Sequence, residues 1–203
     1  MSSWFGTVGD VVVAVMAGYL IGSIPVANLV ARRDGGDDLR TVGDRNPGYW
    51  NAKETIGRRA AIPVFIGDVA KGALAAGIGL ALADPGVWGI AYVATGAAMI
   101  GHAFPAFAGL RGGRSVLTFV GGALVYAPLP ALAALGVVAV VIAVTRSFAW
   151  AARIGIATFP VAQILIEGPY RTAATGALMT FIGVRFVMAA RAAKGVTVVG
   201  VTK

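Results

Sequence analysis

Residues 11–31 read VVVAVMAGYLIGSIPVANLVA, a run of 21 residues that contains no charged side chain. A helix of this length is about 30 Å long, which matches the hydrocarbon thickness of a bilayer. Five or six similar apolar stretches follow along the 203-residue chain. Because only helices and closed barrels satisfy their backbone groups inside a bilayer, we predict an all-α, polytopic membrane protein.

The composition of the chain agrees with this class. Hydrophobic residues make up 58% of the sequence and charged residues 13%, whereas soluble domains carry about 25% charged residues. Spans and short loops use nearly the whole length, so we expect a single integral membrane domain over residues 1–203. The absence of Cys excludes disulfides and thiolate chemistry, and a lone His argues against a metal site. In a membrane protein, a net charge of +8 reflects cationic loops that set the topology and contact anionic lipid. It does not indicate nucleic-acid binding.

Seven membrane-spanning helices are predicted, because Pro128 and Pro130 divide an apolar run that is too long for one span. In this arrangement 14 of the 17 Lys and Arg residues fall on one side, and cationic loops stay in the cytoplasm. The N-terminus is therefore predicted outside. The predicted spans are about 11–31, 60–83, 87–109, 115–126, 130–145, 148–166 and 172–190. The 14 cations are Arg32, Arg33, Arg40, Arg45, Lys53, Arg58, Arg59, Arg111, Arg114, Arg146, Arg153, Arg191, Lys194 and Lys203.

The one long connection between predicted spans is the loop at about 32–59. It mixes both signs of charge and carries several glycines, which is typical of a solvated cytoplasmic loop. It also contains Tyr49, Trp50 and the amides Asn46 and Asn51. Aromatic and amide side chains favour the alternative, a folded loop that lies against the membrane.

A second polar feature is the turn Arg111-Gly112-Gly113-Arg114, directly before a predicted helix. The free N–H groups and positive end of a helix start favour an anion such as phosphate, and the arginines add charge. A tight turn with two topology-setting arginines is the alternative. His102 lies late in the preceding span, and both a packed, hydrogen-bonded role and a catalytic role are open.

A third feature is the pair Asp68 and Lys71 within a predicted span. The i,i+3 spacing places both side chains on one helix face, where pairing reduces the cost of charge in hydrocarbon. A structural ion pair and a substrate-binding role are both consistent with this spacing.

Five polar motifs follow one another along the chain: Gly22-Ser23-Ile24-Pro25, the segment from Gly43 to Asn51, Asp68-x-x-Lys71-Gly72, Gly101-His102-x-Phe104-Pro105-x-Phe107 and the turn 111–114. Taken in this order, they resemble the bacterial acyl-phosphate:glycerol-3-phosphate acyltransferase family over about residues 18–190. The resemblance implies a multi-pass enzyme of the bacterial inner membrane that moves a fatty acyl group from acyl phosphate to the 1-hydroxyl of glycerol 3-phosphate. The product is lysophosphatidic acid, and the resemblance implies no metal or nucleotide cofactor.

The resemblance also implies a set of site residues at the cytoplasmic membrane face. His102 and Arg114 are the candidate catalytic residues, and Asp68 and Lys71 are supporting residues. The residues implied to bind substrate phosphate are Asn46, Gly48, Asn51, Gly112, Gly113, Arg114 and Arg185.

Several positions depart from the family pattern. Asp44 replaces a serine and Glu54 replaces an arginine, while Phe186 and Ala189 stand where the family has His and Asn. The turn 111–114 has arginines in place of lysines. Two carboxylates would repel phosphate unless neighbouring cations neutralise them. We therefore expect either weak or absent activity with glycerol 3-phosphate, or the use of a related polar acceptor in its place. A catalytically inactive paralogue that binds lipid or assists a partner, and a small membrane transporter, are the alternatives.

Overall fold

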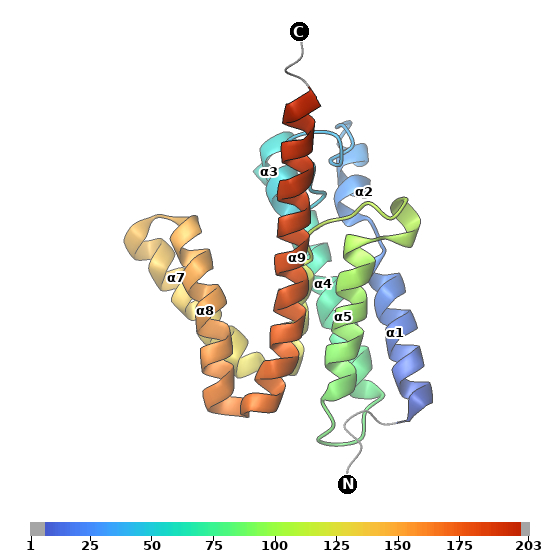
Figure 1. The fold of residues 1–203 in the computed structure, drawn as a ribbon, viewed down its shortest axis with the longest axis vertical. Coiled ribbons are helices and arrows are strands. Elements are labelled where there is room, and N and C mark those ends of the chain that lie inside the picture. Colours follow the sequence, from blue (N-terminus) through green and yellow to red (C-terminus); the bar gives the residue numbers. More distant parts are fainter. Residues whose placement is uncertain (1–6, 200–203) are drawn as a thin grey trace.

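The structure, a computed structural model, describes residues 7–199, with side chains through residue 192. Lys203 and the side chain of Lys194, both part of the predicted charge asymmetry, lie outside the described parts. The described chain is helical throughout and contains no strand (Figure 1). Its elements are α1 (Val8–Gly22), α2 (Val26–Arg33), α3 (Tyr49–Ile56), α4 (Arg58–Ala81), α5 (Gly89–Ala103), the 3-10 turn η1 (Ala106–Ala108), α6 (Val116–Tyr126), α7 (Pro128–Thr145), α8 (Phe148–Glu167) and α9 (Pro169–Val199).

The all-α membrane fold is confirmed, with two differences in the spans. Within the described residues, 6 helical stretches are long and apolar enough to cross a membrane. The predicted division at Pro128 is also found, but α6 has only 11 residues, which is shorter than a full span. The first span is not continuous, since α1 ends at Gly22 and α2 begins after Pro25. Proline lacks an N–H and clashes with the preceding turn, so it ends the first helix segment.

The cation-bearing loops gather at one end of the molecule. In Figure 1 the loop 34–48, the segment 104–115 and the turn between α7 and α8 lie at the end that also holds the C-terminus, and α1 starts at the opposite end. This relative arrangement is the one that the charge pattern predicts. That the cationic end faces the cytoplasm stays a prediction.

Helices α1, α4, α5 and α6 form a tightly packed bundle. A Cβ atom on Gly22 would lie 2.1 Å from the Ala98 carbonyl oxygen, and one on Gly72 would lie 1.7 Å from that of Thr118. These glycines therefore permit backbone contact between α1 and α5 and between α4 and α6, as small residues do in membrane bundles. The bundle supplies a rigid frame for the polar residues of α4 and α5.

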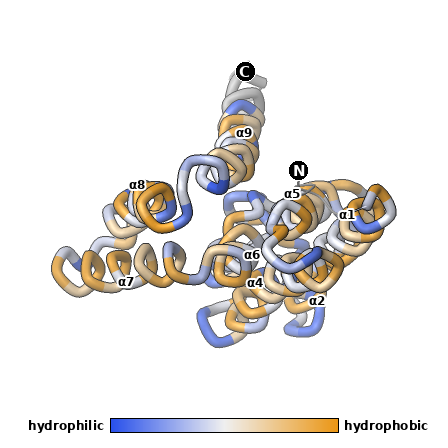
Figure 2. Tube along the Cα trace, turned by 90° about the horizontal axis from the view of Figure 1, so that it is seen from below, coloured by the Kyte–Doolittle hydropathy of each residue, from blue (hydrophilic) through white to orange (hydrophobic). Residues whose placement is uncertain are grey.

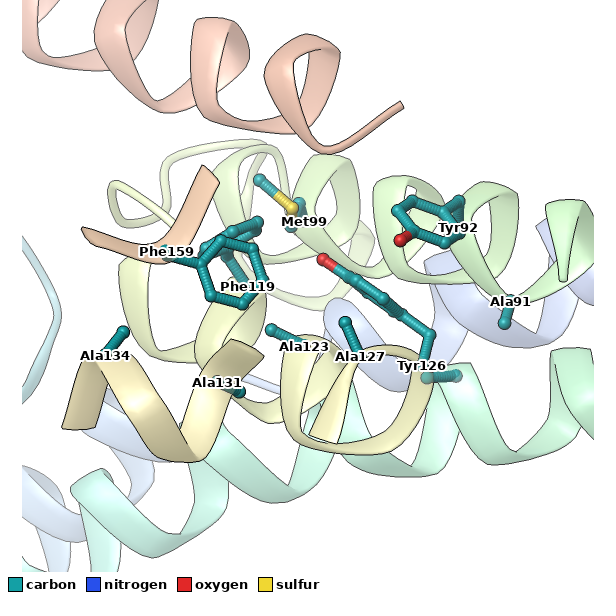
Figure 3. Packing of buried hydrophobic residues seen from close by; sticks show 11 residues of the cluster. Ala91, Tyr92, Met99, Phe119, Ala123, Tyr126, Ala127, Ala131, Ala134 and Phe159 are labelled. Atoms are coloured by element: carbon teal, nitrogen blue, oxygen red, sulfur yellow. The ribbon is translucent and has the colours of Figure 1, made fainter. Parts of the chain in front are cut away.

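The α7–α8 hairpin stands away from this bundle, and its tube is predominantly hydrophobic (Figures 1 and 2). It is joined to the bundle by aromatic contacts, which Figure 3 shows from close by: Phe159 of α8 meets Phe119 of α6 with ring centroids 5.7 Å apart. Nearby, the ring centroids of Tyr92 of α5 and Tyr126 of α6 lie 3.9 Å apart. Helix α9, which follows the hairpin, contacts α5 and α6 of the bundle.

Candidate active site

A pocket opens at the cationic end of the bundle, and five separate parts of the chain line it. The first turn of α2 forms one wall, and the segment 111–113 before α6 forms another. Pro47 of the long loop lies at its side. The ionisable side chains in its lining are Asp68 and Lys71 of α4, His102 of α5 and Arg111.

Asp68, Lys71 and His102 form a buried polar cluster inside this pocket. Their exposed fractions are 2%, 4% and 7%. Lys71 Nζ donates to Asp68 Oδ1 at 2.9 Å, while His102 Nδ1 lies 3.5 Å from that oxygen and 3.4 Å from Lys71 Nζ. The predicted Asp68–Lys71 pairing is thus found, and His102 joins it from another helix. Mutual pairing reduces the cost of burying these ionisable groups at membrane depth.

The glycine turn packs directly against His102. A Cβ atom on Gly113 would lie 2.3 Å from His102 Nε2, and one on Gly112 would lie 1.9 Å from the His102 carbonyl oxygen. The N–H of Gly113 donates to His102 O and that of Gly112 to Ala103 O, both at 3.0 Å. These two N–H groups already have acceptors, so anion binding at this turn, which stays a prediction, would rest on the arginine side chains.

Arg185 of α9 holds the turn from the other side. Its Nε donates to Gly113 O at 3.3 Å and its Nη2 donates to Gly112 O at 3.2 Å. The guanidinium also lies 4.7 Å from the ring centroid of Phe104. These contacts give Arg185 a positioning role in the structure, and its predicted phosphate contact stays a prediction.

Arg114 points toward the long loop. Its Nη1 donates to Asp44 Oδ2 at 3.0 Å, and its guanidinium carbon lies 4.8 Å from the centroid of the Phe186 ring. Glu54 pairs with Lys53 at 3.1 Å on the surface of α3, where the Glu54 side chain is 59% exposed. A cation therefore lies beside each of the two unusual carboxylates and reduces its repulsion of phosphate. Weak or absent activity with glycerol 3-phosphate stays a prediction.

The remaining predicted residues belong to the long loop. Asn51 is 2% exposed and donates to Leu39 O at 2.9 Å and Val42 O at 3.0 Å, so it shapes the loop and does not line the pocket. Gly48 is the N-cap of α3. Asn46 is half-buried beside Pro47, at the edge of the pocket. A substrate contact by any of these three stays a prediction.

The prediction of a folded, membrane-apposed loop fits the contacts of its aromatic residues. Tyr49 packs edge-on against Phe65 of α4, with ring centroids 5.4 Å apart. Trp50 stacks on Phe148 of α8 at the same centroid distance of 5.4 Å. The loop is thus tied to two membrane helices.

A second link joins the loop to the segment 104–115. Arg40 Nε donates to Asp38 Oδ1 at 2.9 Å and Arg40 Nη1 donates to Ala108 O at 2.6 Å. The hydrogen bond from the Arg40 guanidinium lowers the pKa of Asp38 below its usual value, and the same pairing raises the pKa of Arg40. Asp38 therefore holds Arg40 in place for its contact with the neighbouring segment.

One pocket residue was not found by reasoning from the sequence. Asn28 of α2 lines the pocket and is 6% exposed, and its Oδ1 has no hydrogen-bond partner among the described residues. The available signal was an amide inside an uncharged run, since polar side chains within spans are uncommon and often functional. Its buried acceptor is open to a hydroxyl or another donor in the pocket.

Comparison with known proteins identifies similar sequences. Residues 12–197 match the family described as glycerol-3-phosphate acyltransferase. The protein named glycerol-3-phosphate acyltransferase 5 of Dehalococcoides mccartyi is 37% identical over 189 residues, which cover 89% of this chain and 76% of that relative. The glycerol-3-phosphate acyltransferase of Clostridioides difficile is 35% identical over 167 residues, 77% of this chain and 78% of the relative.

Two solved structures have a similar fold. One is PlsY (YgiH), an integral membrane glycerol 3-phosphate acyltransferase, in its glycerol 3-phosphate form. It is 26% identical with a TM-score of 0.75, and the match covers 95% of this chain and 94% of that chain. The lysophosphatidic acid form of the same enzyme matches with a TM-score of 0.72 at 24% identity, over 95% of this chain and 93% of that chain, and supports the fold.

Proposed function

The chain belongs to the glycerol-3-phosphate acyltransferase family and is a membrane acyltransferase of phospholipid biosynthesis, and from this premise we propose that its acyl donor is acyl phosphate and its acceptor the 1-hydroxyl of glycerol 3-phosphate. It is a multi-pass protein of the bacterial inner membrane. The acceptor oxygen forms a bond to the acyl carbon, and the bond from that carbon to the phosphate oxygen breaks. Inorganic phosphate leaves and takes up the hydroxyl proton, which leaves lysophosphatidic acid as the lipid product.

The observation that carries this proposal is the convergence of phosphate-binding features on one pocket. The first turn of α2, Lys71 and Arg111 all line it. In the first turn of α2 the Val26 N–H donates to Ile24 O at 2.9 Å, and the N–H groups that follow it in this turn have no partner within the helix. The positive end of the helix and the charge of Arg111 favour an anion, and Lys71 lies beside its partner Asp68, so a phosphate group is the natural ligand of this wall.

We assign His102 the role of orienting the acceptor hydroxyl. Its Nδ1 faces Asp68 and Lys71, so Nε2 is the ring nitrogen directed away from that pair, toward Gly113. With Nδ1 protonated toward Asp68, Nε2 accepts a hydrogen bond from the hydroxyl. Acyl phosphate is already activated, so orientation of two substrates and stabilisation of developing charge supply most of the required catalysis.

Purified protein in liposomes tests the proposal directly. We expect radiolabelled glycerol 3-phosphate and acyl phosphate to give lysophosphatidic acid and inorganic phosphate in equal amounts. A parallel reaction with acyl-coenzyme A tests the donor, and we expect no product from it. Product from acyl-coenzyme A alone would contradict the assigned donor, and no lysophosphatidic acid from either donor would contradict the proposed reaction.

A further inference from the structure

The ion pair between Asp44 and Arg114 joins two segments that each contribute to the lining of the pocket. Asp44 lies three residues before Pro47, and Arg114 directly follows Gly113; Pro47 and Gly113 both line the pocket. The Asp44 and Arg114 side chains are 38% and 23% exposed. The pair therefore joins two pocket walls that come from distant parts of the sequence, at a place that solvent can reach.

The contacts that hold Arg114 are replaceable. Its Nη1 has one carboxylate acceptor at 3.0 Å, and its planar face lies on the Phe186 ring. Its Nε is buried and has no hydrogen-bond partner among the described residues. A partly exposed ion pair is weak, whereas a guanidinium can bind two oxygens of one phosphate at once. A phosphate group can thus accept more hydrogen bonds from Arg114 than the Asp44 carboxylate does.

The loop does not depend on this pair alone for its attachment. Arg40 is fixed by Asp38 and donates to the Ala108 carbonyl oxygen at 2.6 Å, and this contact joins the same loop to the same 104–115 segment. Asn51 holds the loop internally through the Leu39 and Val42 carbonyls. Arg114 can therefore exchange partners while the loop stays in place.

We propose that Asp44 competes with the phosphate of the acceptor for Arg114 and gives up this partner when the acceptor binds. This inference rests on the proposed function and names an additional element of its acceptor recognition. An acceptor that carries phosphate must displace Asp44 to gain access to Arg114, and it gains Arg114 as a partner in return. Asp44 thus lowers the affinity for phosphorylated acceptors.

The test compares Asp44→Asn with a matched control, Asp37→Asn. The Asn side chain keeps the shape of Asp44 and an oxygen that can accept from the Asn46 N–H, now 3.1 Å from Asp44 Oδ1. Asp37 is exposed on the same loop, and its replacement removes the same charge. We expect Asp44→Asn to lower KM for glycerol 3-phosphate about two- to fivefold, the range of an exposed ion pair, with kcat within about twofold. Asp37→Asn should leave both unchanged.

The same comparison in an Arg114→Gln background tests whether Asp44 acts through Arg114. We expect Asp44→Asn to have no further effect on KM there. An equal fall in KM in both backgrounds would show that Asp44 repels phosphate directly, and an unchanged or raised KM in Asp44→Asn would reduce the pair to a structural contact. Either result overturns the proposal.

Calorimetry of glycerol 3-phosphate binding separates this proposal from the proposed function. If the wild type shows no turnover, the proposed function fails, and binding still decides the role of Asp44. Tighter binding to Asp44→Asn than to the wild type supports the exchange of partners. Equal binding to both proteins, or binding to neither, contradicts it.

Discussion

The position of His102 depends on residues from several elements. Asp68 and Lys71 lie beside its Nδ1, and Gly113 lies against its Nε2. The turn that holds Gly113 is itself fixed by Arg185. The orientation of one imidazole ring is therefore set by side chains from α4 and α9 and by a glycine backbone.

The first prediction concerns the space at Gly113. Gly113→Ala should reduce kcat by at least about tenfold, because its Cβ would lie 2.3 Å from His102 Nε2 and displace the ring. Gly77→Ala is a suitable control, since nothing lies within 4 Å of a Cβ at that position of α4. Steady-state transfer kinetics measure both variants. Full activity in Gly113→Ala would show that the position of the His102 ring is not critical.

The second prediction concerns the buried charges of α4. Asp68→Asn leaves Lys71 without its carboxylate partner and should destabilise the protein by about 3–5 kcal/mol. The double variant Asp68→Asn with Lys71→Met removes both charges and should recover part of that loss. Thermal unfolding in detergent measures both. Equal stability of the single variant and the wild type would show that the buried Lys71 does not need the Asp68 carboxylate as its partner.

The sequence predicts only part of this cluster, and the reason is physical. The i,i+3 spacing of Asp68 and Lys71 is local to one helix, and the structure confirms their pairing at 2.9 Å. The approach of His102 depends on how α5 packs against α4, which local spacing cannot predict. Likewise, the buried role of Asn51 in the loop depends on the Leu39 and Val42 carbonyls, and an amide in a polar loop gives no sign of that partner choice.

Among the elements, the break between α1 and α2 has the clearest consequence for the site. The uncharged run 11–31 predicts one span, but Pro25 ends the helical hydrogen bonding and a new helix begins at Val26. This second start places a first helical turn beside the pocket, together with Asn28. Hydrophobicity predicts the span, whereas the new helix start can be recognised only from Pro25 within it.

The Asp38–Arg40 pair links the long loop to the segment 104–115. Asp38 has a lowered pKa because Arg40 is its partner, so the pair contributes stability above the ordinary carboxyl pKa of about 3.9. That contribution is lost as the pH falls through the lower pKa of the folded protein. At neutral pH, Asp38→Asn should therefore reproduce the acid effect and loosen the loop.

Limited digestion with trypsin measures this effect at Arg45, which is exposed on the same loop. We expect faster cleavage in Asp38→Asn than in the wild type, and no change in Asp37→Asn. The same cleavage rate in all three proteins would show that the contact between Arg40 and the Ala108 carbonyl does not depend on Asp38.

At the scale of the whole molecule, apolar runs and charge predict most of the architecture. The spans and the gathering of cationic loops at one end follow from hydrophobicity and from the Lys and Arg positions. The outward lean of the α7–α8 hairpin could not be predicted, because it depends on contacts with helices that are distant in the sequence. Aromatic rings join the hairpin to α3 and α6, and Gln163 Nε2 of α8 donates to Tyr92 Oη of α5 at 2.8 Å.

The orientation of the molecule in the membrane gives a further prediction. The chain contains no Cys, so single cysteines can be placed at opposite ends. Asp84→Cys lies in the loop between α4 and α5, and Asp37→Cys lies in the long loop. An impermeant maleimide should label position 84 in intact spheroplasts and position 37 only after they are opened. The reverse pattern would contradict the outside placement of the N-terminus.

We place the reaction between acyl phosphate and glycerol 3-phosphate in the pocket that α2, Lys71 and His102 line. The most direct measurement is acyl transfer by the wild type and by His102→Ala in liposomes of the same composition, with thermal unfolding to verify that both are folded. We expect turnover by the wild type and a loss of at least about 100-fold in the variant, the range for a reacting group that is no longer held in position. Undiminished transfer by a folded His102→Ala protein would place the reaction elsewhere and contradict the account.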